Sequence, residues 1–177
     1  MGTRGSALAL VQARWVADRL ERAELVEIVT SGDQAQGVGD KSRWVDAIVL
    51  AAAGLARLGV ARDAAPLDFV PAPGQGTLAI EARDGDERVS SAVAEIHHAA
   101  TFAHLDAERA AVRVLAATCH TPVGIHARDG TIRGFVGLPD GSEWVADELP
   151  AGDGEALARR MIAAGAGELL ARAEALE

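Results

Sequence analysis

Apolar residues near the start of the chain recur at helical spacing and then give way to shorter apolar runs. Ser6 is a good helix N-cap, and the apolar positions after it predict a helix of about four turns. These positions are Leu8, Val11, Trp15, Val16 and Leu20. The run 25–30 then predicts a strand, and the polar, glycine-containing run 31–43 predicts a loop.

The same alternation continues up to residue 98. The apolar run 47–50 predicts a strand covered on both faces, and 51–58 predicts a short helix that ends at Gly59. Prolines and glycines between residues 71 and 76 predict an irregular connection. A strand over 77–82 and a helix over 87–98 follow. Because helix and strand alternate, the N-terminal part is predicted to be an α/β layer with a parallel sheet.

The C-terminal part has a different pattern. It predicts a helix over 101–117 that starts near Thr101 or Asp106, and then strands over 123–127, 131–136 and 143–146. The turn signals Asp129-Gly130 and 139–142 join these strands into hairpins. Helices over 154–164 and 168–176 follow, separated near Gly165 and Gly167. An antiparallel three-stranded sheet packed against helices predicts a self-contained α+β domain.

Composition narrows the classes of function. The net charge is −9 and Lys41 is the only lysine, which argues against general nucleic-acid binding. No run approaches the ~20 apolar residues of a membrane span, and the first residues lack the apolar core of a signal peptide. A single cysteine fits a reducing compartment, so we expect a soluble cytoplasmic protein that does not bind membranes.

The histidines do not have the spacing of a metal site. His97, His98, His104, His120 and His126 show neither the i, i+4 pairing nor the cysteine partners of a zinc site. We therefore expect no metal.

Cys119, the single cysteine, lies between a predicted helix and Pro122. It has no partner for an internal disulfide, so its role is either packing or reactivity. A small buried hydrophobe is the simplest interpretation of such a residue. His120 beside it is a candidate for lowering the thiol pKa, although adjacent residues often point apart.

Four segments, in order, resemble the porphobilinogen deaminases (hydroxymethylbilane synthases). They are 2–12 (GTRGSALALVQ), 46–55 (DAIVLAAAGL), 71–81 (PAPGQGTLAIE), and a C-terminal set. That set comprises Ala107-Glu108-Arg109, Cys119, Pro122-Val123-Gly124, Gly137 and 139–142.

The resemblance implies that Cys119 carries a dipyrromethane cofactor through a thioether. It also implies that porphobilinogen units add head to tail to this primer, each losing ammonia, as in a transferase of tetrapyrrole and haem biosynthesis. A thiolate is well suited to capture an electrophilic pyrrolylmethyl carbon.

The resemblance also suggests which residues hold the pyrrole carboxylates. The guanidinium of Arg4 can form two parallel hydrogen bonds to a carboxylate. Thr3 and Ser6 lie at a predicted helix start, where free backbone N–H groups favour anions. We expect Arg4, Ser6 and Gln75 to bind cofactor, and Thr3 and Lys41 to bind substrate. Each has a simpler alternative. Arg4 and Lys41 are then solvated surface residues, Ser6 only a cap, and Gln75 a turn residue.

The chain departs from this family by an internal shortening. It passes from the loop at Lys41 almost directly to 45–47, without the motif that bears the family's catalytic aspartate and without most of its chain-binding arginines. We assign no catalytic residue. The resemblance implies that 1–98 is a remnant of periplasmic-binding-protein-like domains, with 45–74 from the second family domain. It also implies that 99–177 is the cofactor-attachment domain. Strand edges left without neighbours would favour pairing with a second copy.

The sequence leaves three alternatives for the function. The first is a shortened porphobilinogen deaminase, the second is a module that binds pyrrole carboxylates without turnover, and the third is an inert remnant in which Cys119 is buried. General acid–base catalysis typically raises a reaction rate by a factor of ~10²–10⁴. The missing aspartate therefore disfavours full activity.

Overall fold

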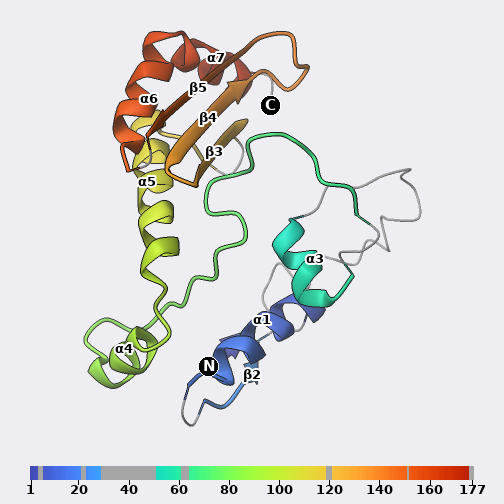
Figure 1. Cartoon of the computed structure of the whole chain (residues 1–177), viewed down its shortest axis with the longest axis vertical. Coiled ribbons are helices and arrows are strands. Elements are labelled where there is room, and N and C mark those ends of the chain that lie inside the picture. The colour runs from blue at the N-terminus through green and yellow to red at the C-terminus, as the bar shows by residue number, and fades with distance from the viewer. Residues whose placement is uncertain are drawn as a thin grey trace. The chain divides into compact units, whose positions relative to one another are not determined.

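The computed structural model describes residues 1–3, 6–20, 23–28, 51–60, 64–118, 121–150 and 152–175. The chain divides into two compact units (Figure 1). The first unit contains residues 1–66 and 78–97, and the second contains 67–77 and 98–177. Among the described helices, none is both long and apolar enough to cross a bilayer.

The first unit begins with a short parallel sheet. β1 (Gly2–Thr3) pairs in parallel with β2 (Val26–Glu27). The predicted strand over 25–30 therefore forms at its centre, and residues 29 and 30 lie outside the described part. The parallel pairing agrees with the α/β pattern of the sequence. The descent from periplasmic-binding-protein-like domains stays a prediction, and so do the predicted loop 31–43 and strand 47–50, which are not described.

Two predicted helices of this unit form, the first of them ending at Ala17, before the predicted position Leu20. α1 (Ala7–Ala17) begins at Ser6, whose hydroxyl accepts a hydrogen bond from the Ala9 N–H at 3.4 Å. α3 (Ala52–Leu58) ends at Gly59, which adopts the left-handed conformation (φ 72°) that glycine reaches without steric cost. The N-cap at Ser6 and the C-cap at Gly59 are confirmed.

The predicted strand over 77–82 was wrong, because the structure has no strand at these residues. At this point the chain passes from the second unit to the first, and a strand forms only where a neighbour completes its hydrogen-bond ladder. The predicted helix over 87–98 is shorter than expected. α4 (Glu87–Ala94) begins at Asp86, whose carboxylate accepts from the Val89 N–H, and it stops before the two histidines.

The second unit is built on the predicted antiparallel sheet. β3 (Val123–Arg128), β4 (Thr131–Gly137) and β5 (Trp144–Pro150) lie in the order β3-β4-β5. Asp129 and Gly130 both have positive φ (49° and 81°), as a two-residue hairpin of the type predicted requires. β5 continues past the predicted end at residue 146 because β4 supplies partners up to Pro150.

Three helices complete this unit. They are α5 (Ala99–Leu115), α6 (Gly154–Ala163) and α7 (Ala166–Glu174). α5 starts earlier than predicted, because the ring of His98 rather than Thr101 or Asp106 acts as the N-cap and accepts from the Thr101 N–H at 3.2 Å. Gly165 separates α6 from α7 as predicted, whereas Gly167, which was also expected between them, lies within α7.

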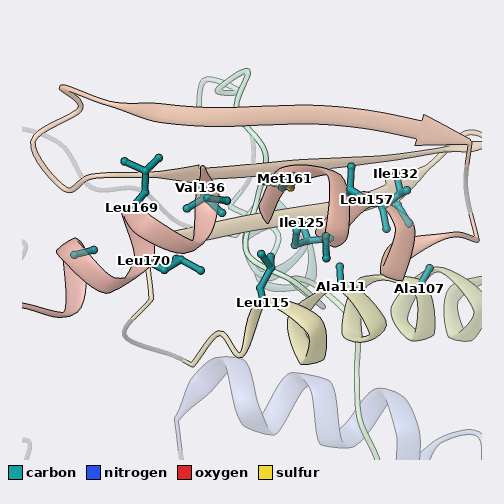
Figure 2. Close-up of a cluster of buried hydrophobic side chains, with 14 of the residues drawn as sticks. Ala107, Ala111, Leu115, Ile125, Ile132, Val136, Leu157, Met161, Leu169 and Leu170 are labelled. Atoms are coloured by element: carbon teal, nitrogen blue, oxygen red, sulfur yellow. The ribbon is translucent and has the colours of Figure 1, made fainter. Parts of the chain in front are cut away.

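The core of the second unit lies between the helices and one face of the sheet. Figure 2 shows side chains from the sheet, such as Ile125 and Ile132, meeting Leu157 and Met161 of α6. These four side chains are fully buried. Alternate residues of β4 point away from the core, so Phe135 is exposed and stacks on Trp144 with ring centroids 6.2 Å apart. The C-terminal α+β fold is therefore confirmed.

Candidate functional site

Two predicted site residues of the first unit, Thr3 and Ser6, lie at the start of α1. The Thr3 hydroxyl donates to the carbonyl of Ala9 at 3.3 Å, and its backbone carbonyl accepts from the Ile28 N–H at 2.7 Å. Ser6 caps the helix, so its hydroxyl oxygen is engaged with Ala9. Both residues therefore have structural roles at a helix start where carboxylates bind favourably. Arg4 and Lys41 lie outside the described residues.

Gln75 belongs to the second unit, within the turn that the sequence predicted. Its side-chain carbonyl accepts from the Ala72 N–H at 3.2 Å, and its own N–H donates to the Ala72 carbonyl at 3.1 Å. The side chain is exposed. Carboxylate binding would use the amide NH₂ group, whereas the local bond uses the amide oxygen, so the two roles are compatible.

Cys119 and His120 lie outside the described residues, but both residues that flank them are described. The Thr118 N–H donates to the Thr121 hydroxyl at 2.7 Å, and the Thr121 N–H donates to the Thr118 carbonyl at 3.2 Å. The two hydroxyls are 3.0 Å apart. The chain on the two sides of the cysteine is thus tied together over a span of four residues. α5 ends just before this tie at Ala116, in the left-handed conformation (φ 53°).

The connecting segment 70–76 is held against β3 at a glycine. A Cβ atom on Gly124 would overlap the carbonyl oxygen of Val70, so only glycine allows this approach without movement. The next residue, Ile125, donates its N–H to the Pro71 carbonyl at 3.0 Å. This bond gives a backbone partner to β3, which lies at the edge of the sheet.

Glu108 connects three elements of the second unit. It lies in the middle of α5, is only 4% exposed, and accepts hydrogen bonds with both carboxylate oxygens. Oε2 accepts from the Gly74 N–H at 2.6 Å, and Oε1 accepts from the Ala127 N–H at 2.8 Å. His126 Nδ1 is 3.3 Å from Oε1. The buried charge is therefore satisfied by groups from the connecting segment and from β3.

Sequence reasoning included Glu108 in a family motif but gave it no role. A signal was present, because Glu108 lies three and seven residues before Ala111 and Leu115, on the apolar stripe of α5. A carboxylate on the buried stripe of a helix requires partners from elsewhere in the fold.

Charged side chains also meet at a shallow hollow of about 440 Å³ beside the start of β5 and α7. Arg172 donates to both carboxylate oxygens of Glu143, at 2.8 and 2.7 Å, which lowers the pKa of Glu143 and raises that of Arg172. Hydrogen bonds from the backbone N–H and the hydroxyl of Ser142 lower the pKa of Asp140. Asp140 is therefore bonded within the 139–142 turn, and Glu143 pairs with Arg172 directly after it.

No group of three or more potential metal ligands occurs among the residues that the structure describes. His98 caps α5 and His126 lies against Glu108, so both have roles within the fold.

Comparison with known proteins adds to this geometry. The family model "Porphobilinogen deaminase, dipyromethane cofactor binding domain" matches residues 1–43 and 39–91. The chain belongs to the porphobilinogen deaminase family. The two matched stretches overlap at residues 39–43, beside the point where the sequence places the internal shortening.

Individual family members match further along the chain. The porphobilinogen deaminase of Thiobacillus denitrificans is 41% identical over 139 residues, covering 71% of this chain and 45% of that protein. The corresponding figures are 39%, 72% and 47% for Thermus thermophilus, and 40%, 75% and 45% for Nocardia farcinica. The chain thus spans less than half the length of these relatives. The predicted domain assignments, 1–98 with a remnant at 45–74 and 99–177, stay predictions.

Proposed function

We propose that this chain carries a dipyrromethane on Cys119 through a thioether and takes porphobilinogen as its substrate, as a transferase of tetrapyrrole biosynthesis. The observation that carries the proposal is the identity of about 40% with porphobilinogen deaminases over at least 71% of the chain. Family membership supplies the substrate class, and the only thiol of the chain supplies the attachment point.

The donor set of the chain fits such a group. A dipyrromethane, once attached, supplies the pyrrole carbon to which further porphobilinogen units add. It bears several carboxylates, and the chain offers a guanidinium at Arg4, first-turn N–H groups after Ser6, and an amide at Gln75. We propose that Arg4, Ser6 and Gln75 hold the cofactor carboxylates, and that Thr3 and Lys41 hold those of the substrate.

Attachment of the first pyrrole to Cys119 is a substitution at carbon and needs no oxidant. The Cys119 sulfur forms a bond to the methylene carbon of porphobilinogen while the bond from that carbon to nitrogen breaks. The thiol proton leaves with the amine as ammonia. The Thr118–Thr121 bonds would keep the two chain segments that flank Cys119 in the sequence in one arrangement.

A second candidate is a module that binds the pyrrole carboxylates and does not release a tetrapyrrole. The specific observation behind it is length, since the chain covers 45% of the relative from Thiobacillus denitrificans. The motif that carries the family's catalytic aspartate has no counterpart in this sequence. Without a positioned acid or base, each addition would lose a factor of roughly 10²–10⁴ in rate.

Intact-mass analysis separates the two candidates. The protein is incubated with porphobilinogen, and a gain equal to two porphobilinogens minus two ammonias is expected, which Cys119→Ser should abolish. Release of a linear tetrapyrrole into solution would establish the transferase, whereas a stable adduct without release would establish the binding module. An unchanged mass would refute both.

We also propose a cytoplasmic location and a second copy of the chain as partner. Trp15, Val26 and Ile28 of the first unit are 45–53% exposed, and β2 is a short strand whose pairing with β1 uses one edge. Burial of such side chains favours association. Light scattering over a range of concentrations should show a dimer, and a monomer at every concentration would contradict the proposal.

A further inference from the structure

The segment that carries Gln75 lies in the second unit, between two stretches of chain that belong to the first. Residues 67–77 belong to that unit, although the chain directly before and after them belongs to the first unit. The segment therefore crosses between units at both of its ends. The contacts that the segment makes with the rest of the second unit therefore determine its position.

Contacts near its start and contacts near its turn both hold it in the second unit. Near its start, Val70 packs closely on Gly124, and the Pro71 carbonyl accepts from Ile125. Near its turn, the Gly74 N–H donates to the carboxylate of Glu108 at 2.6 Å. The first set is backbone against backbone, whereas the second depends on one side chain.

The geometry at Gly74 favours that side chain. Gly74 has φ 71°, and a Cβ at this position would lie 3.0 Å from Leu105 Cδ1, one turn of α5 before Glu108. The segment thus turns directly above α5. At the other oxygen of Glu108, the Ala127 N–H fixes the carboxylate to β3. A carboxylate accepts with both oxygens, whereas an amide of the same shape offers a single acceptor.

We propose that Glu108 is a positioning residue, a latch that fixes the segment 70–76 on α5 and β3. These are the two elements whose ends flank Cys119 in the sequence. The latch holds Gln75 in one arrangement relative to both elements. The consequence for the cofactor rests on the proposed function, in which Gln75 holds a carboxylate of the pyrrole bound to Cys119.

The test compares Glu108→Gln with Asp106→Asn in the full chain. Glu108→Gln keeps the shape but leaves one of the two N–H groups facing an NH₂ group. Asp106 lies on the same helix with a side chain 67% exposed, so Asp106→Asn controls for the loss of a negative charge. Hydrogen exchange, resolved by peptide, is measured over 70–77 and over α6 and α7.

We expect Glu108→Gln to speed exchange at Gly74 and its neighbours by about tenfold or more, with α6 and α7 as protected as in the parent. Asp106→Asn should match the parent throughout. Unchanged exchange over 70–77 would overturn the latch. An equal rise over the whole second unit would also overturn it, since Glu108 would then act on general stability.

A second measurement tests the consequence for the cofactor. The fraction of chains bearing the adduct after incubation with porphobilinogen should fall in Glu108→Gln and stay unchanged in Asp106→Asn. Equal occupancy in both variants, together with faster exchange over 70–77, would overturn the link to the cofactor. Should the parent itself take up no pyrrole, the proposed function fails, and the exchange measurement still decides the latch.

Discussion

The two units of this chain differ in how their apolar side chains are used. In the second unit, large side chains such as Ile125, Leu157 and Met161 are buried between the helices α5–α7 and the sheet (Figure 2). In the described part of the first unit, the buried hydrophobic side chains are those of Ala13 and Val16, whereas Trp15, Val26 and Ile28 are exposed. Among the described residues, the second unit therefore packs its large apolar side chains into a core, whereas the first unit leaves several of them at the surface.

The internal shortening that the family resemblance implies would act unequally on the two units. The three strands of the second unit pair with one another through consecutive connections, so the sheet needs nothing from the rest of the chain. The first unit has a parallel pair, and parallel pairing needs crossovers from distant segments. We therefore expect loss of an internal stretch to affect the first unit more than the second.

The largest expected effect comes from opening the core of the second unit. Leu157→Ala removes a side chain that is fully buried between α6 and the sheet, and should lower the free energy of unfolding by roughly 2–5 kcal/mol. Denaturant unfolding measures the loss. Hydrogen exchange should show it in peptides from 98–175.

Leu58→Ala in α3 of the first unit is the matched control. Leu58 is 38% exposed, so the same substitution should cost under about 1 kcal/mol. Equal losses from the two variants would show that the units do not differ in packing as the structure indicates.

The helices and strands of the second unit could be predicted from its sequence to within about two residues, except for the end of β5. Its signals are local, as in Asp129-Gly130 between apolar runs and Gly165 between two helices. The strand over 77–82 was wrong because apolar alternation is also local, whereas a strand needs a partner that the alternation does not specify. The start of α5 was misplaced because histidine is a less frequent N-cap than threonine or aspartate.

The candidate site was less predictable than the fold. Ser6 and Gln75 were identified through the family resemblance, and the structure gives each a hydrogen bond within its own segment. The role of Glu108 could not be inferred, because its partners Gly74 and Ala127 are 34 and 19 residues away and are backbone groups that every residue carries.

A smaller effect on stability is expected from substitutions at the helix ends of the two units. α3 of the first unit ends on Gly59 and α5 of the second on Ala116, both left-handed. Ala116→Gly should stabilise the second unit by about 1 kcal/mol, because glycine adopts this conformation without steric cost. Gly59→Ala should destabilise the first by a similar amount, since a Cβ there meets nothing within 4 Å and the cost is conformational. Thermal unfolding of both variants checks the signs, and a destabilised Ala116→Gly would contradict the assignment.

The smallest effect concerns acid and the surface of the second unit. Because Arg172 lowers the pKa of Glu143 in the folded state, the pair contributes stability above the ordinary glutamate range, and loses it as pH falls through the lowered pKa. Arg172→Met should therefore lower the urea midpoint slightly at neutral pH, where the pair contributes, and leave it unchanged below the lowered pKa, so that the midpoint depends less on pH below about 5. The loss at neutral pH should be small because the pair is exposed. Asp140 keeps its bonds from Ser142 in this variant, so part of the acid sensitivity should persist. A parallel loss at every pH would mean that Arg172 acts through packing over the hollow rather than through the charge of Glu143.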